Sequence, residues 1–134
     1  MSTNFAKDIN EMYNKFDFHN SILKMDKENL KKLLEFRLLL QNEETFELNE
    51  AVEKQNKEEI VDALIDIIVV AVGTLDLFKI NIQKAWDEVL VANLQKNVGI
   101  KETRPNPNML PDLIKPKGWK PPKHQGNIGI LNKI

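Results

Sequence analysis

Apolar residues recur at helical spacing from the N-terminus to about residue 97, and this pattern predicts four helices. The first runs from about Asn4 to Phe18. A polar, irregular segment follows from His19 to Met25, and Asp26 is a suitable N-cap for a long second helix from about Lys27 to Lys54. No proline or glycine interrupts that second run, so we expect one continuous helix.

The third helix is predicted from about Glu58 to Phe78, after a short polar break at Gln55–Lys57 that suits a tight turn between antiparallel helices. It is apolar at every position from Ile60 to Val72 except for two aspartates, Asp62 and Asp66. Its β-branched residues would also suit a buried strand, but its length and its lack of turn residues favour a helix.

Asn81 is a candidate N-cap for a fourth helix that reaches to about Lys96. Farther along the pattern changes, because all six prolines fall within 104–122. We therefore expect an all-α fold: an antiparallel helical bundle over residues 1–97, followed by an extended, Pro-rich C-terminal tail over 98–134. The tail would pack on the bundle or on a neighbouring subunit.

Composition narrows the function classes. By length the 134 residues suit one domain, and 19 basic against 20 acidic residues give a net charge of −1. That balance favours neither nucleic acid nor a membrane as a partner. We expect no signal peptide, and the most apolar stretch carries aspartates that are costly in a membrane. The chain has no cysteine, which excludes disulfides and thiolate metal sites, and we expect a cytoplasmic protein.

The two aspartates of the third helix are the strongest chemical signal. A carboxylate in an apolar environment is costly unless it is paired or binds a metal, and at i and i+4 the two share a helical face. Glu44 and Glu47 likewise share a face of the second helix. If the two helices pack antiparallel, Glu47 and Asp66 reach similar heights and four carboxylates converge. Such a cluster suits Mg²⁺, with Mn²⁺ as the alternative, and a buried ion pair is the other interpretation.

Other catalytic centres have little support in the sequence. A di-iron bundle needs Glu-x-x-His pairs, but His19 and His124 lie outside the predicted bundle helices. The sequence also offers no nucleophilic triad and no glycine-rich phosphate loop. On the fourth helix, Asn93 and Lys96 share a face at i and i+3. They could hold phosphate oxygens, although a lysine in a last helical turn is also common without a ligand.

These residues resemble a known family. The segment Glu43-Glu44-Thr-Phe-Glu47, followed by Glu59-Ile-Val-Asp62 and then Asp66, is similar to the MazG-like all-α nucleoside triphosphate pyrophosphohydrolases. That superfamily includes phosphoribosyl-ATP pyrophosphohydrolases and dimeric dUTPases. Its pattern is E-E-x-x-E on one helix and E-x-x-D on the next. The resemblance extends to residues 36–42, 69–76 and 87–96, and to the Lys-Pro-Lys-Gly-Trp-Lys-Pro-Pro motif at 115–122.

The aspartate of the family pattern can be placed in two ways. Glu59-x-x-Asp62 fits it literally, whereas ungapped spacing from Glu47 places the family aspartate at Asp66 and the family's second-helix glutamate at Ala63. We prefer the Asp66 register, because it also explains a charge within an apolar helix. Asp62 is then expected to replace the missing glutamate, and Glu59 becomes a candidate for the outer part of the metal site.

The resemblance implies a Mg²⁺-dependent enzyme that converts a nucleoside triphosphate, preferably a deoxynucleotide, to the monophosphate and pyrophosphate. It also implies a MazG-like bundle completed by oligomerisation, as a homodimer or homotetramer, and the long apolar faces agree. The implied roles are metal binding by Glu44, Glu47, Asp62 and Asp66, orientation or deprotonation of the attacking water by Glu43, and phosphate binding by Asn93, Lys96 and Arg37.

Two other functions stay open. A non-catalytic helical oligomer or partner-binding module would keep the fold without turnover, and Ala63 in place of a glutamate favours that reading. Phosphoribosyl-ATP hydrolysis is the second alternative, although the motif at 115–122 is more similar to the nucleotide-scavenging branch. The preferred base and the number of metal ions are not determined by these patterns.

Overall fold

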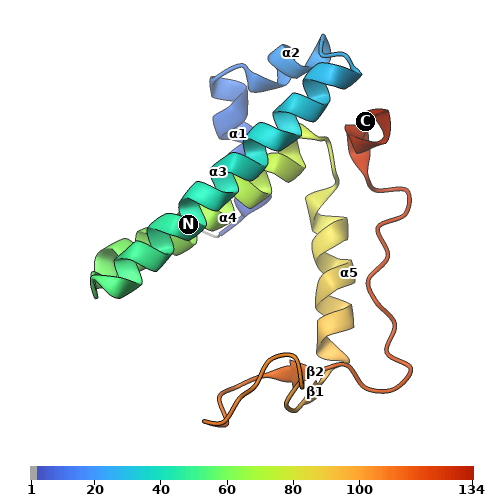
Figure 1. The fold of residues 1–134 in the computed structure, drawn as a ribbon. Helices are drawn as coiled ribbons and strands as arrows, with labels where there is room; N and C mark the ends of the chain where they lie inside the picture. Colours follow the sequence, from blue (N-terminus) through green and yellow to red (C-terminus); the bar gives the residue numbers. More distant parts are fainter. Residues whose placement is uncertain (1–2) are drawn as a thin grey trace. The chain divides into compact units, whose positions relative to one another are not determined.

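The computed structural model describes residues 3–134, which form two compact units. Unit 1 comprises the chain up to Ile82 together with Ile128–Ile134, and unit 2 comprises Gln83–Asn127. Helices dominate the described residues, so the predicted all-α class is confirmed (Figure 1). The division predicted between residues 97 and 98 stays a prediction; residues 98–127 lie in unit 2, and residues 128–134 return to unit 1.

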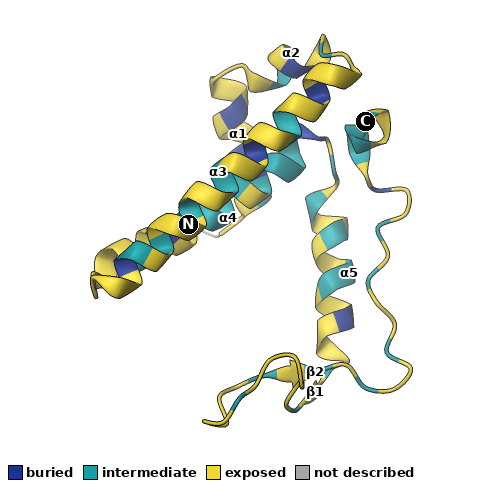
Figure 2. Ribbon diagram, in the orientation of Figure 1, coloured by how far each residue is buried: buried dark blue, intermediate teal, exposed yellow. Residues whose placement is uncertain are grey.

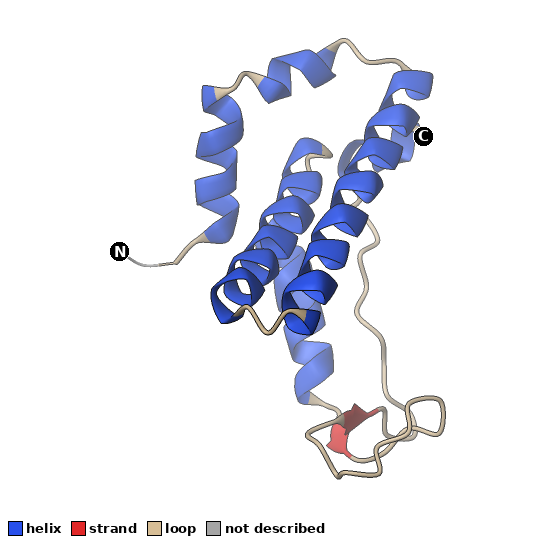
Figure 3. Cartoon of the chain, turned by 60° about the vertical axis from the view of Figure 1, so that its left-hand side comes forward, coloured by secondary structure: helices blue, strands red, loops and turns tan. Residues whose placement is uncertain are grey.

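Unit 1 contains four helices: α1 (Phe5–Lys15), α2 (Phe18–Leu23), α3 (Lys27–Glu53) and α4 (Lys57–Leu77). α3 and α4 lie side by side as an antiparallel pair, and α1 packs against α4 (Figures 1 and 3). The prediction of an irregular segment from His19 to Met25 is wrong, because α2 occupies most of it. The first helix also ends earlier than predicted, since Asp17 adopts a left-handed conformation with φ 59° and separates α1 from α2.

The ends of the two long helices follow from local capping. The side chain of Asp26 accepts a hydrogen bond from the backbone N–H of Asn29 at 2.9 Å, which confirms the predicted N-cap of α3. Gln55 turns the chain with φ 54°, and Asn56 caps α4 by accepting from the N–H of Glu59 at 3.2 Å. The predicted polar break is therefore a tight turn that makes α3 and α4 antiparallel.

The hydrophobic core of unit 1 lies where α1, α2, α3 and the end of α4 meet (Figure 2). The last residues of the chain pack against it, including the 3₁₀ helix η1 (Gly129–Lys133), and the N–H of Ile130 donates to the carbonyl of Phe78 at 2.8 Å. A Cβ at Gly129 would lie 1.9 Å from that carbonyl oxygen, so this approach requires glycine. The buried core residues are Ile9, Tyr13, Ile22, Leu30, Leu77 and Phe78.

A closed ring of four polar side chains ties α1 and α2 to α4. Asn10 Nδ2 donates to Asp76 Oδ1 at 3.0 Å, and the other carboxylate oxygen of Asp76 lies 2.6 Å from His19 Nε2. The second ring nitrogen of His19 lies 2.8 Å from Asn14 Oδ1, and Asn14 Nδ2 donates to Asn10 Oδ1 at 3.1 Å. Because each side chain makes two contacts within the ring, the N-terminal helices are held to α4 by polar contacts as well as by the core.

Unit 2 contains most of α5 (Ile82–Leu94) and a short antiparallel pair, β1 (Asn97–Val98) and β2 (Leu113–Ile114). The fourth helix thus ends two residues before the predicted Lys96. Trp119 Nε1 donates to the carbonyl of Ala92 at 2.7 Å, which attaches the chain after β2 to α5. Within residues 3–134, no helix combines the length and the apolar character needed to cross a membrane.

Candidate functional site

Three carboxylates come together where α3 and α4 pack. Glu44, Glu47 and Asp66 each place one carboxylate oxygen within 4.8 Å of the other two. The i, i+3 spacing puts the two glutamates on one face of α3, and the tight turn at 55–56 brings Asp66 of α4 to the same level. Glu44 and Asp66 are half-buried, whereas Glu47 is exposed.

Glu44 is the most constrained member of this group. Its Oε2 atom is buried and accepts no hydrogen bond within the described part of the chain. Burial raises the pKa of Glu44 above its ordinary value, and the charges of Glu47 and Asp66 raise it further. A side-chain hydrogen bond with Glu47 and the charge of Glu43 act in the same direction. The folded metal-free chain therefore disfavours a negative charge on Glu44.

These observations fit a hard divalent cation. A cation would give the buried Oε2 of Glu44 a partner and would offset the repulsion among the three carboxylates. The donor set is all oxygen, which suits Mg²⁺ or Mn²⁺ better than metals that prefer nitrogen or sulfur ligands. Glu44, Glu47 and Asp66 are the residues that could hold such an ion.

The other predicted carboxylates lie outside this group of three. Asp62 and Glu59 are exposed on α4, at one and two turns before Asp66, and Glu43 is exposed on α3. Ala63, where the Asp66 register places the expected second-helix glutamate, is buried and faces protein. The structure thus brings Asp66, and not Asp62, to the glutamates of α3. The roles assigned to Asp62, Glu59 and Glu43 stay predictions.

Arg37 has a structural environment that sequence reasoning missed. It is 7% exposed; its Nε donates to Thr74 Oγ1 at 3.0 Å, and its Nη2 donates to Tyr13 Oη at 2.9 Å and to the carbonyl of Val70 at 3.0 Å. A Cβ at Gly73 would lie 2.6 Å from Nη2. A glycine within the most apolar helix was the available signal that a large side chain approaches α4 here. The predicted phosphate contact of Arg37 stays a prediction.

Asn93 and Lys96 lie at the end of α5 in unit 2. Asn93 is exposed, and its carbonyl accepts a hydrogen bond from the N–H of Lys96 at 3.1 Å. The ammonium of Lys96 lies 5.4 Å from the ring centroid of Trp119, and that of Lys115 lies 4.9 Å from the same centroid. This aromatic contact was not predicted. Lys115 and Trp119 belong to the 115–122 motif, but the spacing of residues in the sequence does not show which helix this motif approaches.

Comparison with protein-family models gives a match to phosphoribosyl-ATP pyrophosphohydrolase over residues 17–93. The matched segment is more than half of the chain and contains all three grouped carboxylates. No curated protein matches the chain.

Proposed function

The chain belongs to the phosphoribosyl-ATP pyrophosphohydrolase family, and from this premise we propose that it is a metal-dependent enzyme that cleaves a nucleoside triphosphate to the monophosphate and pyrophosphate. The family name itself indicates a pyrophosphohydrolase, and the proposal adds the substrate class and the metal. One observation supports it above the others: the group of Glu44, Glu47 and Asp66 includes a buried carboxylate oxygen without a hydrogen-bond partner.

We propose Mg²⁺ as the metal, with Mn²⁺ as the alternative. Glu44, Glu47 and Asp66 would hold it, with Asp62 and Glu59 on the outer, exposed side of α4. When bound, the ion supplies positive charge that offsets the negative charge of the triphosphate as the anhydride bond breaks. In its absence the three carboxylates repel a triphosphate, so activity should require a divalent cation.

The remaining roles fall to side chains of the protein. Glu43 is exposed beside Glu44, so its carboxylate is free to orient the attacking water or to accept its proton. Asn93 and Lys96 offer an amide and an ammonium for phosphate oxygens. Arg37 acts as a positioning residue, because its contacts with α1 and α4 fix α3 and hence the direction of the glutamates.

Self-association is part of the proposal. Large apolar side chains are exposed on both long helices of unit 1, which is costly for an isolated bundle and supports a homodimer or homotetramer. The cytoplasmic location expected from the lack of cysteine stays a prediction. The exposed apolar residues are Phe36, Leu38, Leu39 and Phe46 on α3, and Val61, Leu64 and Ile65 on α4.

A second candidate substrate is phosphoribosyl-ATP, and the family match favours it specifically. It carries the same triphosphate chain, so the cation and the carboxylates would act in the same way on either molecule. The two candidates differ in the base and its substituent, which only a substrate comparison distinguishes.

The test is a substrate panel with a pyrophosphate assay. The chain is incubated with dUTP, dCTP, dGTP, ATP and phosphoribosyl-ATP, each with Mg²⁺ and with EDTA. Pyrophosphate release that needs Mg²⁺ and is lost in Glu47→Gln, but kept in the matched control Glu53→Gln near the end of α3, would support the proposal. No release from any nucleotide by the folded chain with Mg²⁺ would leave the non-catalytic helical module as the better reading.

A further inference from the structure

Unit 2 contains a basic pocket of its own. A hollow of about 340 Å³ lies beside the β1–β2 pair, within the size range of small-molecule sites. Four of its seven lining residues are cationic and none is acidic. The lining residues are Lys96, Ile100, Lys101, Arg104, Leu113, Ile114 and Lys115.

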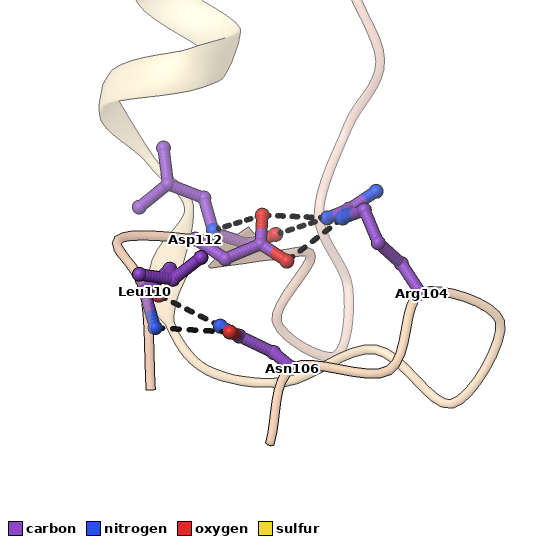
Figure 4. A network of polar contacts seen from close by, with 5 residues as sticks. Arg104, Asn106, Leu110 and Asp112 are labelled. Carbon is purple, nitrogen blue, oxygen red and sulfur yellow. Dashed lines mark hydrogen bonds and ion pairs between the residues drawn. The ribbon is translucent and has the colours of Figure 1, made fainter. Parts of the chain in front are cut away.

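One of the four cations is already neutralised. Arg104 donates from Nε and Nη2 to the two carboxylate oxygens of Asp112, at 2.8 and 2.7 Å, so its charge is matched (Figure 4). The pair lowers the pKa of Asp112, with Arg104 as the main cause and the charge of Lys101 as a smaller one. The ammonium groups of Lys96, Lys101 and Lys115 are left with no carboxylate of their own at ion-pair distance in the described chain.

The loop that carries this pocket is held in place by paired contacts. Asn106 donates from Nδ2 to the carbonyl of Leu110 at 2.7 Å and accepts from its N–H at 2.9 Å, and the Arg104–Asp112 pair closes the same loop (Figure 4). Gly99 helps to shape the apolar wall, since a Cβ there would lie 2.5 Å from Ile114 Cδ1. A site whose walls are already ordered loses less entropy when a ligand binds.

The charge of the chain is divided unequally between its two units. Unit 2 carries eight lysines and arginines against four acids, a net charge of +4, whereas the remaining residues carry eleven against sixteen, a net charge of −5. The whole-chain value of −1 conceals this difference. The three grouped carboxylates and the unmatched lysines therefore lie in units of opposite net charge.

We propose that the pocket of unit 2 binds an oligophosphate anion, through the ammonium groups of Lys96, Lys101 and Lys115. Ile100 and Ile114 add apolar surface beside these ammonium groups. The cationic pocket is a property of unit 2 alone, whereas the choice of an oligophosphate as its occupant rests on the proposed function. The phosphates come either from free pyrophosphate or from the chain of a nucleotide.

A small anion fits this pocket better than nucleic acid does. The unmatched lysines line one hollow instead of following an extended stripe, and binding to a nucleic-acid backbone needs a run of cations along the strand. Two phosphates also bring enough negative charge to match three ammonium groups, which a single phosphate does not.

The test is isothermal titration of pyrophosphate into the full chain in EDTA. Without a divalent cation the carboxylates of unit 1 repel pyrophosphate, so binding reports on unit 2. Lys101→Gln and Lys115→Gln should each weaken binding about tenfold, the usual effect of losing one contact to a charged group. The matched control Lys117→Gln, which changes an exposed lysine outside the pocket, should stay within about twofold of the wild type. Lys101→Arg should restore binding.

Parallel titrations with orthophosphate and dUTP identify the source of the phosphates. Pyrophosphate at least tenfold tighter than orthophosphate supports the oligophosphate reading, and equal affinities overturn it. Equal losses in Lys117→Gln and Lys101→Gln would show diffuse attraction and overturn the site. The pyrophosphate-release assay distinguishes this proposal from the proposed enzyme function. If the chain binds pyrophosphate through Lys101 but releases none from any nucleotide, only the enzyme function is refuted. If the chain releases pyrophosphate but shows no Lys101-dependent binding, only the pocket is refuted.

Discussion

Replacing Glu44 by glutamine tests the electrostatics of the carboxylate group most directly. Glutamine keeps the shape of the side chain and removes its charge. In the metal-free chain the charge of Glu44 faces those of Glu47 and Asp66, and its buried Oε2 lacks a hydrogen-bond donor. We therefore expect Glu44→Gln to stabilise the fold in EDTA at neutral pH, which is unusual for a substitution at a half-buried position.

The expected gain is about 1–2 kcal/mol. Two unit charges separated by 4.8 Å repel each other by about 0.9 kcal/mol in water and about 3.5 kcal/mol at an effective dielectric constant of 20. Glu44 forms two such pairs, one with Glu47 and one with Asp66. Because Glu47 is exposed and solvent screens its charge, the summed repulsion of the two pairs should lie near the value calculated for water. For a chain of this length, a gain of 1 kcal/mol raises the melting temperature by roughly 4 °C.

The pH dependence has a definite sign. The folded-state pKa of Glu44 is raised above its ordinary value of 4.5, so the folded chain binds this proton more tightly than the unfolded chain does. The free energy of unfolding of the metal-free wild type should therefore fall as pH rises from about 4.5 through the raised pKa. Glu44→Gln should lack this fall, so the two melting temperatures converge at acid pH and separate above neutrality.

The assay is thermal unfolding across pH 4–8, in EDTA and in excess Mg²⁺, with Glu53→Gln as the control from the same helix. Wild type should gain about 2.7 kcal/mol when Mg²⁺ is a hundredfold above its dissociation constant, and Glu44→Gln should gain less. If Glu44→Gln unfolds at a lower temperature than wild type in EDTA at pH 8, the reasoning from charge crowding is wrong.

Two further substitutions test how α1 and α3 are held to α4. Gly73→Ala should lower the free energy of unfolding by about 1–3 kcal/mol, because its Cβ would lie 2.1 Å from Tyr13 Oη. The measurement is urea unfolding, and an unchanged midpoint would show that the surrounding side chains move to accommodate the methyl group. Asp76→Asn removes the charged partner of His19 and should lower the free energy of unfolding by about 1–3 kcal/mol. Amide hydrogen exchange in α1 and α2 should become faster, and unchanged exchange would contradict the role of the Asp76–His19 contact in holding these helices to α4.

The long helices could be predicted closely because local signals agree there. Uninterrupted periodicity, the cap at Asp26 and the polar break at 55–57 place α3 and α4 within about one residue of their observed ends. α2 was missed because a left-handed residue, Asp17, breaks the periodicity without any glycine or proline to mark it. The sequence did not indicate which tail residues would reach the bundle, because the return of residues 128–134 to the core depends on contacts far apart in the sequence.

The candidate site was predicted in part. Glu44, Glu47 and Asp66 were all expected and do converge. The burial of Arg37 and the contact of Lys96 with Trp119 were not expected, since both depend on the packing of distant segments.

The sequence by itself determined which carboxylates share a helical face, because helical spacing and side-chain charge are local properties. Spacing from Glu47 favoured Asp66 for the family aspartate, but it left Asp62, on the same face one turn earlier, as a further expected ligand. Only the tertiary structure brings Asp66 within 4.8 Å of the glutamates of α3, because the turn at 55–56 sets the level at which α4 meets them. It also decided that Glu44 is the carboxylate with the raised pKa, since desolvation depends on what packs around a group and not on its neighbours in the chain.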